Sequence, residues 1–146
     1  MKPEDIDILR LENQLCFPLY AASREVIKQY HPYLEKIGLT YTQYIAMIVF
    51  WEKKRMNVKE LGNRLFLDSG TLTPVLKSLE NKGLVRRYRS DMDERMLVVE
   101  ITEAGEALRE KAMDLPIVMM QHFHLPVEDA MELYRLLYKL LGREKI

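Results

Sequence analysis

The sequence predicts a mainly α-helical domain with a small β-hairpin wing, and two observations lead to this prediction. Two short segments with helical spacing of apolar residues, ending near Leu65 and Asn81, follow each other across a short link. After Gly83 the apolar period changes from helix-like to the two-residue alternation of strands. Paired helices followed by a hairpin make up a winged helix-turn-helix. A chain of 146 residues has the length of a single domain, 1–146.

Two elements are expected before this unit. Apolar residues recur at helical spacing over about 5–31, which predicts a long first helix. Pro18 lies within this segment, and the hydrogen bond that it removes predicts a bend just after Cys16. Thr40 and Gln43 form a capping-box pattern, in which each side chain binds the backbone N–H of the other residue. The pattern predicts a second helix that ends at about residue 52.

The helix-turn-helix with its wing is expected to span about 41–101. The basic residues 53–55 are interpreted as a polar break after the second helix. Asn57 and Asp68 are predicted to cap the two short helices that follow, because their side-chain oxygens accept from backbone N–H groups in the first turn.

The remaining elements are two strands joined by a polar turn and two further helices. Alternation predicts the strands, Thr102 is a helix-capping residue, and Pro126 is suited to the start of a helix. The expected ranges are 84–89 and 96–101 for the strands and 102–121 and 126–141 for the helices.

The charges of the whole chain cancel, with 22 basic and 22 acidic residues, which by itself argues against a nucleic-acid partner. Their distribution is uneven, because residues 53–95 contain eleven basic and six acidic groups. A basic block between two acidic arms produces a local field that the total conceals. A solvated charged surface is the alternative interpretation, and charge alone does not choose between the two.

The cysteine count and the N-terminus predict the compartment. A single cysteine, Cys16, excludes a disulfide framework within the chain. The acidic N-terminal segment lacks the features of a signal peptide, and no apolar run approaches the length of a membrane span. We therefore expect a soluble cytoplasmic protein without membrane contact.

The predicted helix-turn-helix supplies the candidate DNA-binding residues. Small and hydroxyl side chains at the start of its second helix allow the backbone to approach DNA, and arginines on a wing can enter a narrow minor groove. Acids of the wing turn are expected to orient those arginines by pairing with them. A hairpin with one wet face is the alternative. The candidates are Ser69, Gly70, Thr71, Thr73, Lys77, Arg86, Arg87, Arg89, Asp93 and Arg95.

Three of these segments resemble the MarR family of transcriptional regulators: 61–87, 91–95 and 101–105. Segments 15–20 and 38–44 resemble its OhrR subgroup, which senses organic hydroperoxides. The resemblance extends over nearly the whole chain. It implies a winged helix-turn-helix repressor that pairs through its terminal helices.

Cys16 is the candidate redox-sensing residue, although a lone cysteine on an apolar stripe is more often core filler. Tyr20 lies one helical turn further on the same face, and a hydroxyl that donates to a thiolate lowers the thiol pKa. The resemblance adds Tyr30 and Tyr41, which in OhrR-like proteins approach the sensing cysteine of the other subunit. It also implies the single-cysteine type, in which the oxidised thiol forms a mixed disulfide with a small cellular thiol or overoxidises.

The terminal helices, about 5–31 and 103–143, are expected to form a homodimer, because the last helix bears more apolar surface than its own core can cover. Burial within one domain is the alternative. A two-fold dimer predicts a palindromic operator. No metal or other cofactor is expected, since His122 and His124 fall on different faces of a helix.

Together these observations predict a DNA-binding repressor, not an enzyme, that releases its operator when organic hydroperoxide oxidises Cys16. A MarR-like regulator of a small aromatic ligand, with Cys16 merely structural, is the first alternative. A thiol peroxidase and a winged helix that binds protein are the others.

Overall fold

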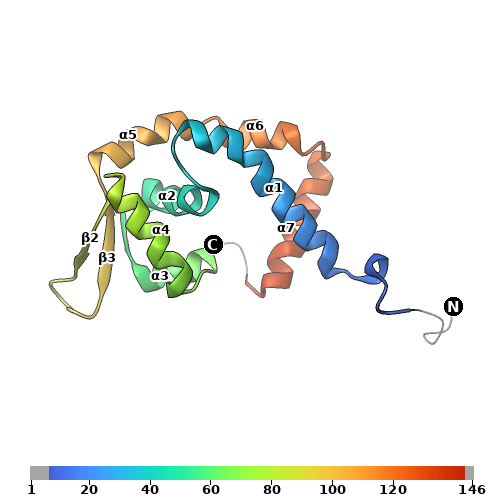
Figure 1. Ribbon diagram of the computed structural model, residues 1–146, viewed down its shortest axis with the longest axis horizontal. Helices are drawn as coiled ribbons and strands as arrows, with labels where there is room; N and C mark the ends of the chain where they lie inside the picture. Colours follow the sequence, from blue (N-terminus) through green and yellow to red (C-terminus); the bar gives the residue numbers. More distant parts are fainter. Residues whose placement is uncertain (1–6, 144–146) are drawn as a thin grey trace.

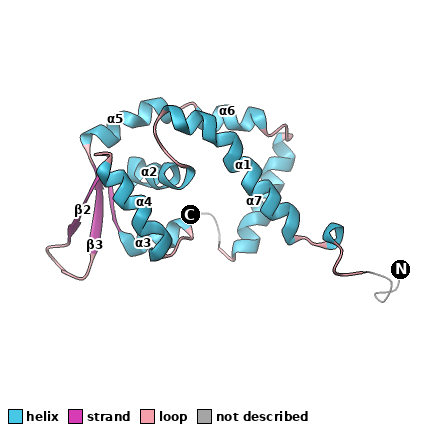
Figure 2. Cartoon of the chain, viewed as in Figure 1, coloured by secondary structure: helices cyan, strands magenta, loops and turns pink. Residues whose placement is uncertain are grey.

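The computed structural model describes residues 7–143, whose helices and strands have the order expected for a winged helix (Figures 1 and 2). The helices are α1 (Cys16–Lys36), α2 (Tyr41–Lys53), α3 (Val58–Leu65), α4 (Ser69–Asn81), α5 (Glu103–Ala112), α6 (Leu115–His122) and α7 (Val127–Leu141). The strands are β1 (Arg55–Asn57), β2 (Val85–Arg89) and β3 (Leu97–Ile101). The mainly helical fold with a small antiparallel sheet confirms the predicted fold class.

Helix α2 lies at the centre of the core. Most of its residues are buried, and it contacts α1 and α5 as well as α3, α4 and the sheet. Phe50 and Met47 are fully buried, and the Trp51 indole Nε1 donates to the carbonyl of Gly105 over 2.8 Å. Since a buried indole N–H needs a partner, this bond fixes α5 against α2.

The predicted helix caps are all present. Thr40 and Gln43 form the reciprocal capping box, with 3.3 Å from Gln43 N to Thr40 Oγ1 and 3.1 Å from Thr40 N to Gln43 Oε1. The side chains of Asn57, Asp68 and Thr102 each accept from the backbone N–H three residues on. These short-range bonds define the start of four helices, as their sequence patterns indicated.

The sheet has three strands, where a two-stranded hairpin was expected. Residues 53–55 were interpreted as a polar break, but Arg55 begins strand β1, which pairs with β3 opposite Glu100. The strand order is β1-β3-β2. Three residues are too few to show a two-residue period, so only the pairing with β3 identifies this strand.

The first helix was placed wrongly at about 5–31. Within the described part of that range, residues 7–15 contain a 3-10 turn over Leu11–Asn13, and α1 begins only at Cys16. Pro18 therefore lies in the first turn, where its missing N–H has no helical partner, and the expected bend does not form. Residues 5 and 6 lie outside the described residues.

The single helix expected over 102–121 is two helices. Helix α5 ends at Ala112 and α6 begins at Leu115, with Pro116 in its first turn. A proline at 116 has no N–H for the carbonyl of Ala112, so a continuous helix is unfavourable here. After α6 the chain reverses direction into α7 (Figure 1). No helix within 7–143 meets the length and hydropathy of a membrane span.

Gly105 of α5 faces Leu84, directly before β2, and Ile101 of β3, and this close approach generates a stability prediction. A Cβ at Gly105 would lie 2.2 Å from the carbonyl oxygen of Leu84 and 2.7 Å from Ile101 Cγ1. Gly105→Ala is therefore expected to lower the free energy of unfolding by about 1–3 kcal/mol, as overpacking does. Urea denaturation followed by Trp51 fluorescence measures the change in the free energy of unfolding.

Gly70→Ala is the matched control, because its Cβ would meet only Asp68 Oδ1, at 3.4 Å. Equal stability of the two variants would contradict the clash.

Candidate functional site

The N-terminal half of α4 presents a polar face to solvent. Ser69, Gly70, Thr71 and Thr73 are exposed, and so is Lys77 one turn further along, whereas the apolar residues between them face the core. Asp68 Oδ1 accepts from Thr71 N at 2.7 Å, and this bond lowers the pKa of the Asp68 carboxyl. The start of α4 is thus a rigid, capped turn without bulky side chains.

The hairpin of β2 and β3 extends from this lobe, and one arginine at its tip is fully accessible. The side chain of Arg95 is 95% exposed, and its Nε lies 3.6 Å from Asp93 Oδ1. Asp93 Oδ1 also accepts from the backbone N–H of Arg95 at 3.0 Å, which orders the turn. Asp93 is thus the acid of the turn that pairs with Arg95. Exposed Arg89 lies at the end of β2, where the turn begins.

Arg86 and Arg87 pair outside the turn. Arg86 Nε donates to Glu100 on the neighbouring strand at 2.6 Å. Arg87 is mostly covered, and its guanidinium and backbone N–H both bind the carboxylate of Glu80 on α4, at 3.1 and 2.9 Å. The hydrogen bonds from Arg87 hold the pKa of Glu80 below its usual range. Arg87 thus joins the wing to α4, and Glu80 is a residue that sequence reasoning did not single out.

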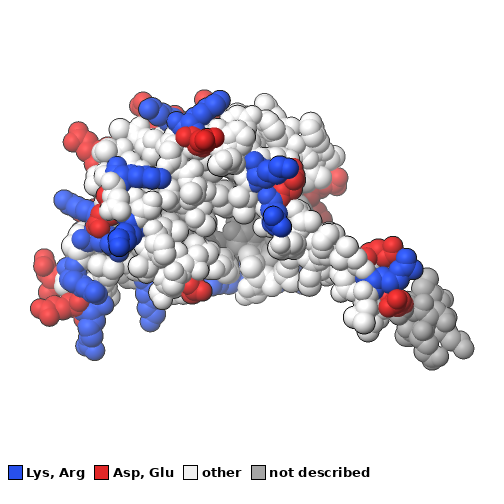
Figure 3. Space-filling model, viewed as in Figure 1, with Lys and Arg blue, Asp and Glu red and all other residues white. Residues whose placement is uncertain are grey.

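A cleft of about 400 Å³ lies between the wing and α3, and it adds a basic residue to the surface. Lys59, in the first turn of α3, lines it together with Asp93 and Arg95. Figure 3 shows Lys and Arg side chains gathered around the end of the molecule that carries the sheet and α4, with acids among them. Lys59 was missed because it contributed only to the charge count of the central segment.

Cys16 is the first residue of α1 and is exposed. Tyr20, one turn further, accepts a hydrogen bond from Arg24 Nη1 at 3.0 Å, and the Arg24 guanidinium lies 5.5 Å from the centre of the Tyr20 ring. Within its own chain, the thiol is therefore not packed into the core.

Tyr30 and Tyr41 lie together, as the resemblance implied. Their ring centres are 5.1 Å apart, and Tyr44 completes a cluster at 5.7 Å from Tyr30 and 6.2 Å from Tyr41. Burial, with the neighbouring Tyr44 and Tyr41, raises the pKa of Tyr30 to about 12. Burial also raises the pKa of Tyr41. Both hydroxyls therefore stay protonated at neutral pH and can act as donors.

The cluster is remote from the cysteine of its own chain. Cys16 and Tyr30 belong to the same helix, and fourteen residues at 1.5 Å each separate them by roughly 21 Å along its axis. A thiol at Cys16 and a donor at Tyr30 can therefore meet only if they come from two different chains.

Helix α7 and the first half of α1 expose apolar side chains. No residue of α7 is buried. Leu15, directly before α1, is 82% exposed, and Tyr20 within α1 is 58% exposed. On α7, Met131 is 68% exposed and Leu140 64%. Large apolar side chains are therefore left uncovered by their own chain on both elements.

No group of three or more potential metal ligands is found among residues 7–143. His122 is engaged in hydrogen bonds instead: Nε2 lies 3.1 Å from the Tyr33 hydroxyl, and Nδ1 lies 2.7 Å from the carbonyl of Val118.

Comparison with known proteins places this surface and these residues in context. Residues 28–112 match the SarA/Rot family of transcriptional regulators. The chain is 49% identical over 135 residues to an organic hydroperoxide resistance transcriptional regulator of Bacillus subtilis, covering 92% of each. It is 42% identical over 123 residues to the transcriptional regulator SarZ of Staphylococcus aureus, covering 84% of this chain and 83% of SarZ.

Solved structures of DNA-binding regulators have a similar fold. Reduced AbfR bound to DNA superposes with a TM-score of 0.76 at 34% identity, covering 92% of this chain and 94% of AbfR. A crystal structure of AbfR of Staphylococcus epidermidis gives a TM-score of 0.74 at 34% identity, covering 92% of this chain and 92% of AbfR. A mutant MarR of E. coli complexed with operator DNA gives a TM-score of 0.79 at 24% identity, a likeness of fold.

Proposed function

The chain belongs to the SarA/Rot family of transcriptional regulators and to the OhrR-like branch of the MarR family, and from this we propose that it is a thiol-switched repressor. It binds duplex DNA while Cys16 is reduced and releases the DNA when organic hydroperoxide oxidises the thiol. The observation that supports this most is the exposed Cys16 in a chain 49% identical to an organic hydroperoxide resistance regulator. A regulator of this kind must reach chromosomal DNA, so we propose a cytoplasmic location, as the sequence led us to expect.

DNA binding follows from the polar start of α4 and from the wing. The exposed Ser69, Gly70, Thr71, Thr73 and Lys77 face outward along one side of α4, which suits insertion into a major groove. Arg95 extends from the hairpin tip and enters the adjacent minor groove, with Arg89 beside it. Arg86 retains an exposed guanidinium, while Arg87 acts by fixing the wing to α4. Related regulators are known bound to DNA.

We propose that the exposed apolar faces of α1 and α7 pair two copies of the chain. A two-fold dimer buries Leu15, Met131 and Leu140 and brings Cys16 of one chain toward Tyr30 and Tyr41 of the other. The separation of roughly 21 Å within one chain is the geometric support for this arrangement. Two α4 helices related by this axis read a palindromic operator.

Sedimentation equilibrium of the reduced protein is expected to give twice the chain mass, and a single-chain mass would contradict the dimer.

The proposed chemistry begins at the Cys16 thiolate. The sulfur attacks one oxygen of the hydroperoxide, an S–O bond forms, the O–O bond breaks, and the leaving alkoxide takes a proton to become an alcohol. Donors at Tyr30 and Tyr41 stabilise the thiolate. The sulfenic acid then condenses with a small cellular thiol, losing water, to give a mixed disulfide. This bulky product at the apolar contact alters the relative position of the two DNA-binding units.

Substitution of Cys16 tests the switch. Cys16→Ser is expected to bind operator DNA as tightly as the wild type, because Cys16 is not one of the proposed DNA-contacting residues of α4 and the wing. It is not released by cumene hydroperoxide, since serine cannot be oxidised in this way. Fluorescence anisotropy of a labelled operator, taken from the DNA upstream of the protein's own gene, measures both properties.

Two results bear on the alternatives. Normal release of Cys16→Ser would contradict the sensor and favour a regulator of a small aromatic ligand. Tyr30→Phe keeps the ring and removes only the hydroxyl, and it is expected to slow the oxidation of Cys16 by cumene hydroperoxide in the dimer. An unchanged rate of oxidation in Tyr30→Phe would exclude this hydroxyl as the donor.

Arg95 tests the wing. Arg95→Ala is expected to weaken operator binding and to reduce the slope of log Kd against log salt by about one, as loss of one phosphate-neutralising charge does. Arg10→Ala is the matched control, since this exposed arginine pairs with Glu12 near the N-terminal end of the chain. Equal affinity and salt dependence of the two variants would argue against a wing contact with DNA.

A further inference from the structure

Gln43 is the one buried polar or charged side chain within the described range, with 6% of its surface exposed. All of its polar atoms have partners. Oε1 accepts from Thr40 N at 3.1 Å and from Lys82 Nζ at 2.8 Å, and Nε2 donates to Ser78 Oγ at 2.9 Å. Gln43, the second member of the capping box of α2, is therefore also bonded to α4. Its partners there are Ser78 in the last turn, 35 residues away in the sequence, and Lys82 directly after the helix, 39 residues away.

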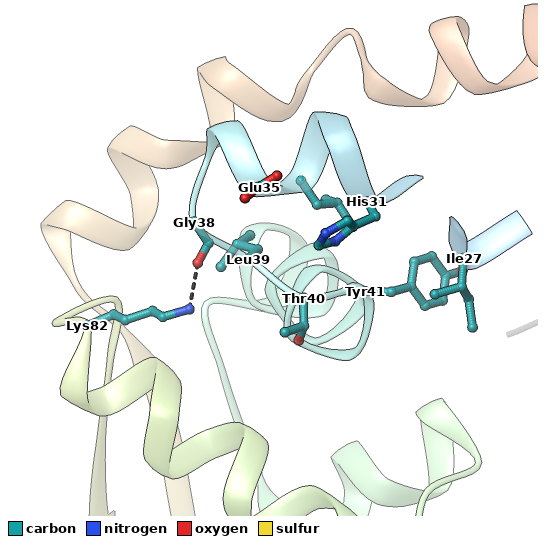
Figure 4. A pocket seen from close by; sticks show the side chains of 9 residues that line it. Ile27, His31, Glu35, Gly38, Leu39, Thr40, Tyr41 and Lys82 are labelled. Atoms are coloured by element: carbon teal, nitrogen blue, oxygen red, sulfur yellow. Dashed lines mark hydrogen bonds between the residues drawn. The ribbon is translucent and has the colours of Figure 1, made fainter. Parts of the chain in front are cut away.

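Lys82 extends this junction to the end of α1. Its Nζ donates to the carbonyl oxygen of Gly38 at 2.5 Å, in the turn between α1 and α2 (Figure 4). Gly38 has a φ of +73°, which holds its carbonyl in a conformation that other residues rarely adopt. The ammonium group of Lys82 thus binds the α1–α2 turn through Gly38 and the start of α2 through Gln43.

The same turn of α2 contains a member of the tyrosine cluster. Tyr41 is the first residue of α2 and Gln43 the third. A cleft of about 330 Å³ opens beside them, lined by Tyr41, Thr40 and His31 on one side and by Lys82 on the other (Figure 4). The cluster and the junction therefore lie on adjoining parts of one rigid helical turn.

We propose that Gln43 is a positioning residue that transmits the state of the tyrosine cluster to α4. The inference rests on the proposed function, in which an oxidised Cys16 of the second chain meets Tyr30 and Tyr41. An adduct there displaces Tyr41 and with it the first turn of α2. A buried amide cannot leave its partners without a large loss of stability, so Ser78 and Lys82 follow Gln43. The C-terminal end of α4 is thereby shifted, and its N-terminal end leaves the DNA groove.

Two mild variants cut the junction and leave the capping box intact. Ser78→Ala removes the acceptor of Gln43 Nε2, and Lys82→Met removes the ammonium group. Lys54→Met is the matched control, because Lys54 Nζ pairs instead with Glu106 on α5, at 2.6 Å. For each protein, operator Kd is measured reduced and after treatment with cumene hydroperoxide plus a small thiol, while intact-protein mass follows oxidation of Cys16.

The expected result is a reduced-state Kd near that of the wild type and complete oxidation of Cys16, with the ratio of oxidised to reduced Kd falling about fivefold or more in both variants. Lys54→Met keeps the wild-type ratio. An unchanged ratio in Ser78→Ala and Lys82→Met would overturn the proposal that Gln43 transmits the change to α4. Loss of operator binding by the reduced variants would also overturn it, because the junction would then only hold α4 in place. If the wild type itself is not released on oxidation, the proposed function fails instead.

Discussion

The burial of α2 is the constraint on which the other elements depend. Its apolar side chains contact α1, α3, α4, α5 and the sheet, so none of these elements has a complete core without it. Phe50 and Met47 exclude water from this centre, and Trp51 binds the backbone of α5. A helix packed at this density does not deform gradually. Movement at its first turn is therefore passed on to its neighbours.

Local signals in the sequence were sufficient for most of the fold. The caps at Thr40, Asn57, Asp68 and Thr102 each depend on a bond to the third residue ahead, so their patterns are legible in a short window. Strand β1 depends on pairing with residues more than forty positions away, and no local pattern reveals it. The start of α1 was misplaced because apolar periodicity continued into a segment that does not form an α-helix.

The sequence identified candidate residues for the site, but it did not reveal which side chains those residues contact. Cys16, Tyr30, Tyr41 and Arg95 were identified from sequence and resemblance, and the two tyrosines do lie together. The pairing of Arg87 with Glu80 was not foreseen, because charge counts treat an arginine that joins two elements like one that is free in solvent. Gln43 was recognised only as a cap. Its second set of partners comes from α4, and only the tertiary fold brings them within reach.

The raised pKa of Tyr30 has a consequence for the fidelity of the signal. A phenol that ionises near pH 12 has the same charge throughout the range of acidity that a living cell experiences. Tyr41, whose pKa is also raised by burial, behaves in the same way. In the dimer that we propose, both hydroxyls therefore remain neutral hydrogen-bond donors whether the cell is acidic or neutral. In that respect the cluster differs from a histidine-based pocket, whose protonation would change with every modest drift in cellular pH.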